Sequence, residues 1–253
     1  MHAIKTERVH LYENLREPMS LRAMRSYHRL LDRRLAHEPT PYIIGHKEFL
    51  GLEFEVTRAA IIPRPETETL VELAVDFART HYAAATPTVA DIGTGSGAIA
   101  VSLAHRLINA RVIAIDVSKR SLALARRNAA RHGVADRIKF LHGNTLAPVT
   151  APVEVIAANL PYVTTEQWEA TPLEIREHEP RGGLDGGPDG LRYIRKLLRQ
   201  APGKLARDGA LFAEIGDWQG VEAAFLARRA FPTADVDVRP DLAGRDRVLC
   251  VFT

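Results

Sequence analysis

Two short motifs combine residue types that could bind a nucleoside and a planar amino group. The first motif runs from Asp91 to Ala98 and has glycine at 93, 95 and 97, and the second is Asn-Leu-Pro-Tyr at 159–162. Each follows a short apolar run that is typical of a buried strand. A glycine turn between a strand and a helix lets a ligand approach the backbone, and the helix N-terminus offers free N–H groups. The first motif therefore predicts a ligand site.

An acidic residue completes the nucleoside pattern. Asp116 lies 116 − 97 = 19 residues after Gly97, at the end of the next predicted strand, where a carboxylate can accept hydrogen bonds from both ribose hydroxyls. The predicted strand, the predicted helix and the acidic residue together argue that the glycine motif binds a ligand and is not merely a glycine-rich turn. Gly93, Gly95 and Ala98 satisfy the dinucleotide fingerprint, and a Gly-x-Gly-x-Gly reading suits S-adenosylmethionine (SAM). The first motif alone leaves both adenosine ligands open.

The second motif suits an amide or amino group as ligand. The side-chain oxygen of Asn159 can accept one N–H, and Pro161 holds Leu160 extended, which aims the Leu160 carbonyl at a second N–H. Tyr162 can lie flat against a planar substrate. Two acceptors and an aromatic face favour methyl transfer to nitrogen over hydride transfer, which needs an acid or base beside the nicotinamide. SAM is therefore the preferred ligand.

Alternating strands and helices explain how the two motifs would meet. The pattern predicts an α/β fold with a doubly wound, mostly parallel sheet. Ligands of such sheets bind beyond the carboxyl ends of the strands. Strands are expected at 89–92, 111–115, 138–141, 153–158, 210–215, 236–238 and 248–252. Helices are expected at 19–36, 98–107, 118–132, 189–205 and 218–229. A further helix is expected to begin with Pro65 near its first position.

The first fifty residues carry the whole charge excess. They hold nine Lys and Arg against six Asp and Glu, a balance of 9 − 6 = +3, and residues 51–253 hold 25 of each. Arg22, Arg25, Arg29 and Arg33 form one stripe of the predicted helix 19–36, which is either solvated surface or a docking face for an acidic or RNA-containing partner. The balanced remainder argues against nucleic acid as the direct substrate.

Composition excludes several protein classes. Hydrophobic residues make up 46% of the chain and charged residues 26%, which excludes a disordered chain. The sequence has no apolar run of about 18 residues, so we expect no membrane span. From the polar start we expect no secretory signal, and the single cysteine, Cys250, suits a reducing cytoplasm. The sequence contains no His-x-x-x-His or Cys-x-x-Cys pair, so we expect no dedicated zinc site.

Further segments in a fixed order extend the two motifs into a family resemblance. They lie at 38–45, 48–49, 62–68 (Ile-Pro-Arg-Pro-Glu-Thr-Glu), 91–98, 159–162, 179–180, 186–190, 214–216 and 244–247. Together they resemble the release-factor glutamine methyltransferases, the HemK family. The resemblance implies a class I SAM-dependent methyltransferase with a seven-stranded sheet. It also implies methyl transfer to the side-chain amide nitrogen of the glutamine in the Gly-Gly-Gln motif of class I peptide chain release factors.

The resemblance also implies roles and domains. Asn159 and Tyr162 would be catalytic and, with Leu160 and Pro161, would bind the substrate. The family pattern has proline where this chain has Leu160, and commonly an acidic residue at Asn144. Residues 1–40 would be a helical substrate-docking segment, 41–62 a hairpin linker and 63–253 the methyltransferase domain. The cofactor would contact Gly93, Thr94, Gly95, Ser96, Gly97, Asp116 (ribose), Asn144, Thr145 (both at the adenine) and Asn159.

Two alternatives stay open. The Asn-Leu-Pro-Tyr spelling also resembles rRNA adenine dimethyltransferases, so the chain could be an adenine N6-methyltransferase acting on RNA or DNA. It could instead be a non-catalytic SAM-fold binding protein. The intact glycine loop, Asp116 and Asn159 argue against the second alternative.

Overall fold

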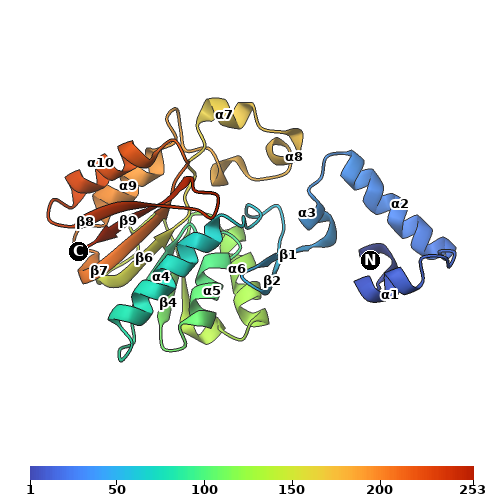
Figure 1. The fold of residues 1–253 in the computed structure, drawn as a ribbon, viewed down its shortest axis with the longest axis horizontal. Helices are drawn as coiled ribbons and strands as arrows, with labels where there is room; N and C mark the ends of the chain where they lie inside the picture. Colours follow the sequence, from blue (N-terminus) through green and yellow to red (C-terminus); the bar gives the residue numbers. More distant parts are fainter.

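A central twisted sheet organises the molecule (Figure 1). The computed structural model describes the backbone of residues 1–253 and every side chain except that of Arg8. Within these residues the main sheet has seven strands in the order β5-β4-β3-β6-β7-β9-β8. Only β9 runs antiparallel to its neighbours there, which confirms the mostly parallel sheet. The strands are β3 (Thr88–Ile92), β4 (Arg111–Asp116), β5 (Ile138–His142), β6 (Val153–Ala158), β7 (Leu205–Glu214), β8 (Asp235–Pro240) and β9 (Asp246–Phe252).

Helices cover both faces of this sheet, as a doubly wound fold requires. One face carries α4 (Thr67–His81), α5 (Ala98–Arg106) and α6 (Lys119–Arg131). The other carries α9 (Arg192–Gln200) and α10 (Gly220–Ala230). Between β6 and α9 the chain forms α7 (Thr165–Glu169), α8 (Leu173–Arg176) and the short helix η3 (Arg181–Gly183), and η2 (Ala135–Arg137) precedes β5.

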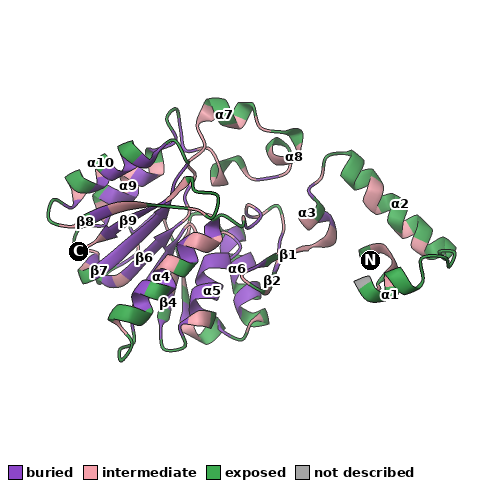
Figure 2. Cartoon of the chain, viewed as in Figure 1, coloured by how far each residue is buried: buried purple, intermediate pink, exposed green. Residues whose placement is uncertain are grey.

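Alternate residues of the strands fill two cores, one on each face of the sheet. Val89 and Phe212 pack toward α4 and α5, whereas Ile92 and Ile156 pack toward α9 and α10. Successive side chains of a strand point to opposite faces, so strands buried on both sides are apolar throughout. Figure 2 shows these strands as the most continuously buried part of the chain.

A small hairpin links the N-terminal segment to the sheet domain. It consists of β1 (His46–Phe49) and β2 (Leu52–Glu55), and both of its phenylalanines, Phe49 and Phe54, are fully buried. Asn128 of α6 fixes the hairpin, because its amide bonds the backbone N–H and C=O of Glu55 and also the carbonyl of Ser96. The hairpin is therefore anchored beside the glycine loop.

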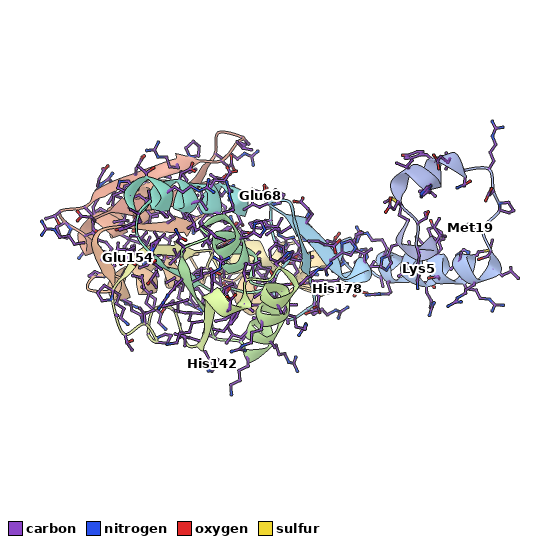
Figure 3. The ribbon with its side chains drawn as sticks, turned by 90° about the horizontal axis from the view of Figure 1, so that it is seen from below. Lys5, Met19, Glu68, His142, Glu154 and His178 are labelled. Atoms are coloured by element: carbon purple, nitrogen blue, oxygen red, sulfur yellow. The ribbon has the colours of Figure 1, made fainter. Side chains whose placement is uncertain are left out.

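The N-terminal segment stands away from the sheet domain, as Lys5 and Met19 mark in Figure 3. It contains η1 (His2–Ile4), α1 (Arg8–Glu13), α2 (Leu21–Leu35) and α3 (Thr40–Ile44). The predicted helix 19–36 is confirmed, with the Ser20 hydroxyl accepting from the N–H of Ala23 at 3.2 Å. Arg33 leaves the predicted stripe, because it bonds Glu38 and the carbonyl of Tyr42 and so fastens α2 to α3.

Several element boundaries differ from the sequence-based expectation. The predicted helix 189–205 covers only 192–200, because the chain turns at Pro202 and Gly203 and β7 already begins at Leu205. Helix α4 begins after Glu66, so Pro65 precedes the helix instead of occupying its first position. Helix α3 (residues 40–44) extends into the start of the predicted hairpin linker 41–62. No helix of the described chain has the length and apolar character to span a membrane.

Candidate functional site

The sheet brings the two motifs into contact. Ile92 of β3 is in register with Ala158 of β6, so Gly93 and Asn159 leave the sheet side by side. Gly93 has φ +79°, and a Cβ there would lie 3.0 Å from Leu160 Cδ2 and 3.3 Å from the Asn159 carbonyl oxygen. Only glycine tolerates this conformation and approach without strain. The expectation that both motifs share one strand edge is confirmed.

A cavity of about 230 Å³ opens at this edge. Of the residues predicted to bind the cofactor, Gly93, Gly95, Asp116, Asn144, Thr145 and Asn159 line it. Thr94 and Ser96 instead face a second cavity of about 40 Å³ that shares Gly93, Gly95 and Asn159 with the first. Gly97 is the N-cap of α5, and a Cβ at that position would contact Ala125. The first cavity also has lining residues that the motifs did not indicate, among them Ala59, Ile61, Val117, Pro180, Gly183 and Tyr193.

Asp116 presents a fixed carboxylate to the larger cavity. The backbone N–H of Gly95 donates to its Oδ2 at 2.9 Å, and that of Ser118 donates to Oδ1 at 2.8 Å. Burial raises the pKa of Asp116, and these N–H groups act in the opposite direction. A carboxylate oxygen can accept more than one hydrogen bond, so both oxygens keep a lone pair for a ligand. The arrangement fits ribose hydroxyls.

Asp91 holds the glycine loop from beneath. Its Oδ2 accepts from the Thr94 hydroxyl at 2.6 Å and from the N–H of Ala100 at 3.0 Å. The carboxyl is fully buried, and its Oδ1 has no partner among the described side chains. Burial raises the pKa of Asp91 to about 7. The carboxyl thus ties the loop to the first turn of α5 and destabilises the fold when ionised.

The stability of the Asp91→Asn variant, relative to that of the wild type, is expected to rise with pH. The folded state binds the Asp91 proton up to about pH 7, whereas the unfolded state releases it near pH 4. Wild-type stability therefore falls across this window, by at most about 1.4 kcal/mol per pH unit, and asparagine has no such loss. Urea unfolding of both proteins at pH 5 and pH 8 measures the difference. An equal difference in unfolding free energy between the two proteins at pH 5 and pH 8 would contradict this prediction.

Asn159 lies where the two cavities join. Its Nδ2 donates to Thr67 Oγ1 at 2.9 Å. Its Oδ1 makes no hydrogen bond to any described group, and neither does the Leu160 carbonyl. The structure thus leaves free the two acceptors that the sequence predicts for an amide N–H pair. Phe49, Ile62 and Thr67 line the smaller cavity, whereas Asp116 lines only the larger one. The smaller cavity is therefore the candidate place for a substrate amide beside Asn159.

The Tyr162 hydroxyl is hydrogen-bonded inside the protein. It donates to Glu214 Oε1 at 3.0 Å, and burial raises the pKa of that hydroxyl. The side chain lies behind the motif, and the two cavities described here have Asn159, Leu160 and Pro161 in their walls without it. Stacking of the ring against a substrate stays a prediction.

Sequence reasoning did not single out the residues that support the second motif. Gln219 Nε2 donates to the Tyr162 carbonyl at 3.1 Å, and a Cβ on Gly190 would overlap the same carbonyl. Glu214 and Thr67 contact the side chains of the motif. Gly190, Glu214 and Thr67 lie in short segments that carry the family resemblance, whereas Gln219 lies outside all of them. Spacing along the chain gives no signal for such long-range contacts.

Two family models match this chain. One is described as "Methyltransferase domain" and matches residues 89–183, and the other is described as "PrmC N-terminal domain" and matches residues 1–45. The first covers β3 through the segment after α8, including both motifs. The second covers the N-terminal segment up to the hairpin.

Curated relatives extend the similarity to nearly the whole chain. A protein of Moorella thermoacetica named release factor glutamine methyltransferase is 41% identical over 99% of this chain and 87% of its own length. Proteins of the same name are 40% identical in Geobacter sulfurreducens, over 98% and 84%, and 35% identical in Bacillus anthracis, over 98% and 88%.

Solved structures share the fold at lower identity. A methyltransferase from Pyrococcus furiosus is 18% identical with a TM-score of 0.57, and the match covers 91% of this chain and 98% of that one. The ribosomal protein L11 methylase from Lactobacillus delbrueckii subsp. bulgaricus is 22% identical with a TM-score of 0.54, over 75% and 79%. These similarities confirm the class I methyltransferase architecture.

Proposed function

This chain belongs to the release factor glutamine methyltransferase family, and on that premise we propose that it methylates a release factor. The methyl group passes from SAM to the side-chain amide nitrogen of the glutamine in the Gly-Gly-Gln motif of class I peptide chain release factors. Identity of 41% over 99% of the chain supports the assignment. The structural observation that carries it is Asn159, which lines both cavities and whose Oδ1, like the neighbouring Leu160 carbonyl, has no hydrogen-bond partner among the described residues.

The larger cavity suits SAM. Gly93 and Gly95 would border its methionine part, Asp116 would hold the ribose, and Asn144 and Thr145 would flank the adenine. When bound, SAM supplies an electrophilic methyl group on a sulfonium. The cavity walls beside Asp116 are apolar at Val117 and Ile115, which suits the faces of a purine ring.

The chemical task of the chain is chiefly to position the amide. An amide nitrogen is a poor nucleophile because its lone pair is delocalised into the carbonyl. Alignment of the reacting atoms at about 3–3.5 Å supplies much of the rate enhancement. Asn159 Oδ1 and the Leu160 carbonyl can each accept one N–H, which fixes the plane of the amide. The same acceptors stabilise the positive charge that develops on nitrogen. The proton leaves afterwards, so no strong base is required.

The N-terminal segment, residues 1–40, would dock the release factor. Its helix α2 has no buried residue, and Arg22, Arg25 and Arg29 lie along it. Several apolar side chains of the segment are also exposed, including Tyr12, Leu15 and Leu21. A surface that combines basic and apolar groups suits a protein partner. We place the reaction in the cytoplasm, where release factors act.

A labelling experiment tests the proposed function. The purified protein is incubated with methyl-labelled SAM and, in parallel, with a class I release factor, ribosomal RNA or DNA. We expect label in the release factor only, and none in a control release factor whose Gly-Gly-Gln glutamine is replaced by alanine. Label in RNA or DNA would support the adenine alternative. Binding of SAM with no transfer would support the non-catalytic alternative.

A further inference from the structure

We propose that Gln200 is a positioning residue for SAM, because its side-chain oxygen holds the turn at Asn144 and Thr145 that borders the larger cavity. The inference rests on the proposed function only in placing the adenine of SAM at this turn, and it involves no release factor. Gln200 is the last residue of α9. The walls of the larger cavity are formed without its side chain, so Gln200 acts through the turn.

Thr145 has a strained backbone conformation. Its φ is +54°, in the left-handed region, where a β-branched residue is a clear outlier. Thr145 is 5% exposed and lines the larger cavity together with Gly143 and Asn144. Strain of this kind persists only where the surrounding contacts over-determine it, and it is concentrated at functional sites. The conformation of Thr145 therefore depends on groups that hold it in place.

The Gln200 side chain supplies two of the contacts that hold this turn. Its Oε1 accepts from the backbone N–H of Leu146 at 2.9 Å and from the Thr145 hydroxyl at 2.7 Å. A backbone N–H can only donate, so the contact with Leu146 fixes which end of the Gln200 amide faces the turn. One side-chain oxygen thus binds both the strained residue and the residue after it.

The Thr145 hydroxyl can act only as a donor in this arrangement. Its Oγ1 lies 2.7 Å from Gln200 Oε1 and also 2.7 Å from the Asn144 carbonyl oxygen. Both of these oxygens are acceptors without a proton, so the single hydroxyl proton must be directed toward them. Removal of the Gln200 oxygen would leave the hydroxyl with the Asn144 carbonyl alone.

The other end of the turn is fixed beside the proposed ribose site. The backbone N–H of Gly143 donates to the carbonyl of Asp116 at 3.0 Å. A Cβ on Gly143 would lie 2.7 Å from Pro148 Cγ, so the chain is tightly packed at this point. Asn144 and Thr145 therefore lie between two anchors, Gly143 on one side and the Gln200 contacts on the other. Loss of the Gln200 anchor would free Thr145 to relax, whereas the end at Gly143 would stay in place.

A second side chain supports the same turn further from the cavity. Lys204 Nζ donates to the carbonyls of Leu146 and Val149, at 2.6 and 3.0 Å. Both of these residues are buried, and the cavity walls are formed without them. Lys204 thus holds the base of the turn, whereas Gln200 holds the part that meets the ligand. The two side chains allow structural support to be separated from control of the cofactor site.

Titration calorimetry with SAM alone tests the inference on the intact chain. We expect Gln200→Leu to raise the Kd for SAM about 10-fold, which corresponds to about 1.4 kcal/mol, because the released turn relaxes away from the adenine. Gln200→Glu keeps an acceptor at the same place and should bind SAM within about threefold of wild type. Arg199→Ala changes an exposed side chain of the same helix and is the matched control, with an unchanged Kd. Equal Kd values for wild type and Gln200→Leu would overturn the inference.

Lys204→Met distinguishes positioning from general support of the fold. This variant loses two contacts at the base of the turn, so it should lower the Tm and change the Kd for SAM less than about threefold. A Kd raised as much by Lys204→Met as by Gln200→Leu would show that any loosening of the turn weakens binding. That result would overturn the specific role of Gln200.

A glycine at position 145 tests whether Gln200 acts through the strain of Thr145. Glycine adopts a positive φ without the cost that threonine has. The Kd of Thr145→Gly is measured first, and Gln200→Leu is then added to it. We expect this second change to raise the Kd less than about threefold, because coupled residues do not contribute additively. A 10-fold rise in both backgrounds would overturn the inference.

Hydrogen exchange in the ligand-free protein keeps this test separate from the proposed function. The amide of Leu146, followed by NMR, reports the bond to Gln200, and the amide of Gly143 reports the other anchor. We expect faster exchange at Leu146 in Gln200→Leu but not in Gln200→Glu, with Gly143 unchanged in both. Unchanged exchange at Leu146 in Gln200→Leu would overturn the inference even if the protein methylates a release factor. If the protein does not, faster exchange together with weaker SAM binding still supports the inference.

Discussion

Replacement of Asn159 by alanine is expected to lower kcat for release factor methylation by about 10²–10³-fold, the loss typical of removing one charge-stabilising group from an active site. The variant loses the Oδ1 acceptor at the junction of the two cavities. Asp116 and the glycine loop stay in place, so the affinity for SAM should change only a few-fold. Steady-state kinetics with release factor and a direct SAM-binding assay separate the two effects.

A matched variant controls for the loss of an asparagine as such. Asn109 is exposed in the loop that precedes β4, and Asp116 lies at the other end of that strand. Asn109→Ala should keep wild-type turnover. Full activity in Asn159→Ala would contradict the role assigned to this side chain.

Gly190→Ala is expected to damage both activity and stability. Gly190 has φ +73°, and a Cβ there would overlap the carbonyl of Tyr162 and lie 2.5 Å from Gln219 Nε2. The backbone of the second motif would have to move, and displacement by an ångström can cost about 100-fold in rate. Thermal unfolding and kcat measure the two consequences.

Gly203→Ala serves as the comparison for Gly190→Ala. Gly203 has φ +77°, but a Cβ there would meet nothing within 4 Å, so alanine experiences the strain of the left-handed conformation alone. That strain costs about 1–2 kcal/mol. Gly203→Ala should therefore lower the Tm modestly and leave kcat unchanged. Equal effects of the two variants would show that backbone strain, and not contact with the second motif, limits substitution at Gly190.

The sequence predicts best what depends on local pattern. The strand at 153–158 and the Ser118-capped helix agree closely with β6 and α6, because apolar runs and caps act over a few residues. The meeting of the glycine loop with Asn159 was also predictable, since parallel strands end at a common edge. The short helices α7 and α8 have no apolar periodicity long enough to indicate them.

Contacts between distant segments were not predictable in the same way. Thr67 and Asn159 are 92 positions apart, and Tyr162 and Glu214 are 52 apart. An aromatic residue after a proline suggests a stacking surface, and nothing local indicates that its hydroxyl is bound from behind. For this reason Tyr162→Phe, which keeps an aromatic ring for stacking, still removes a donor to Glu214 in the structure.

The central claim is that this chain methylates the amide nitrogen of a release factor glutamine. Fragment mass spectrometry of the release factor after incubation with the protein and SAM tests it most directly. We expect a peptide heavier by one methyl group, with the added mass on the side chain of the glutamine in Gly-Gly-Gln. At matched incubation times we expect about 10²–10³-fold less of this peptide with Asn159→Ala, in line with its lower kcat. An unmodified glutamine, or a methyl group on another residue, would contradict the claim.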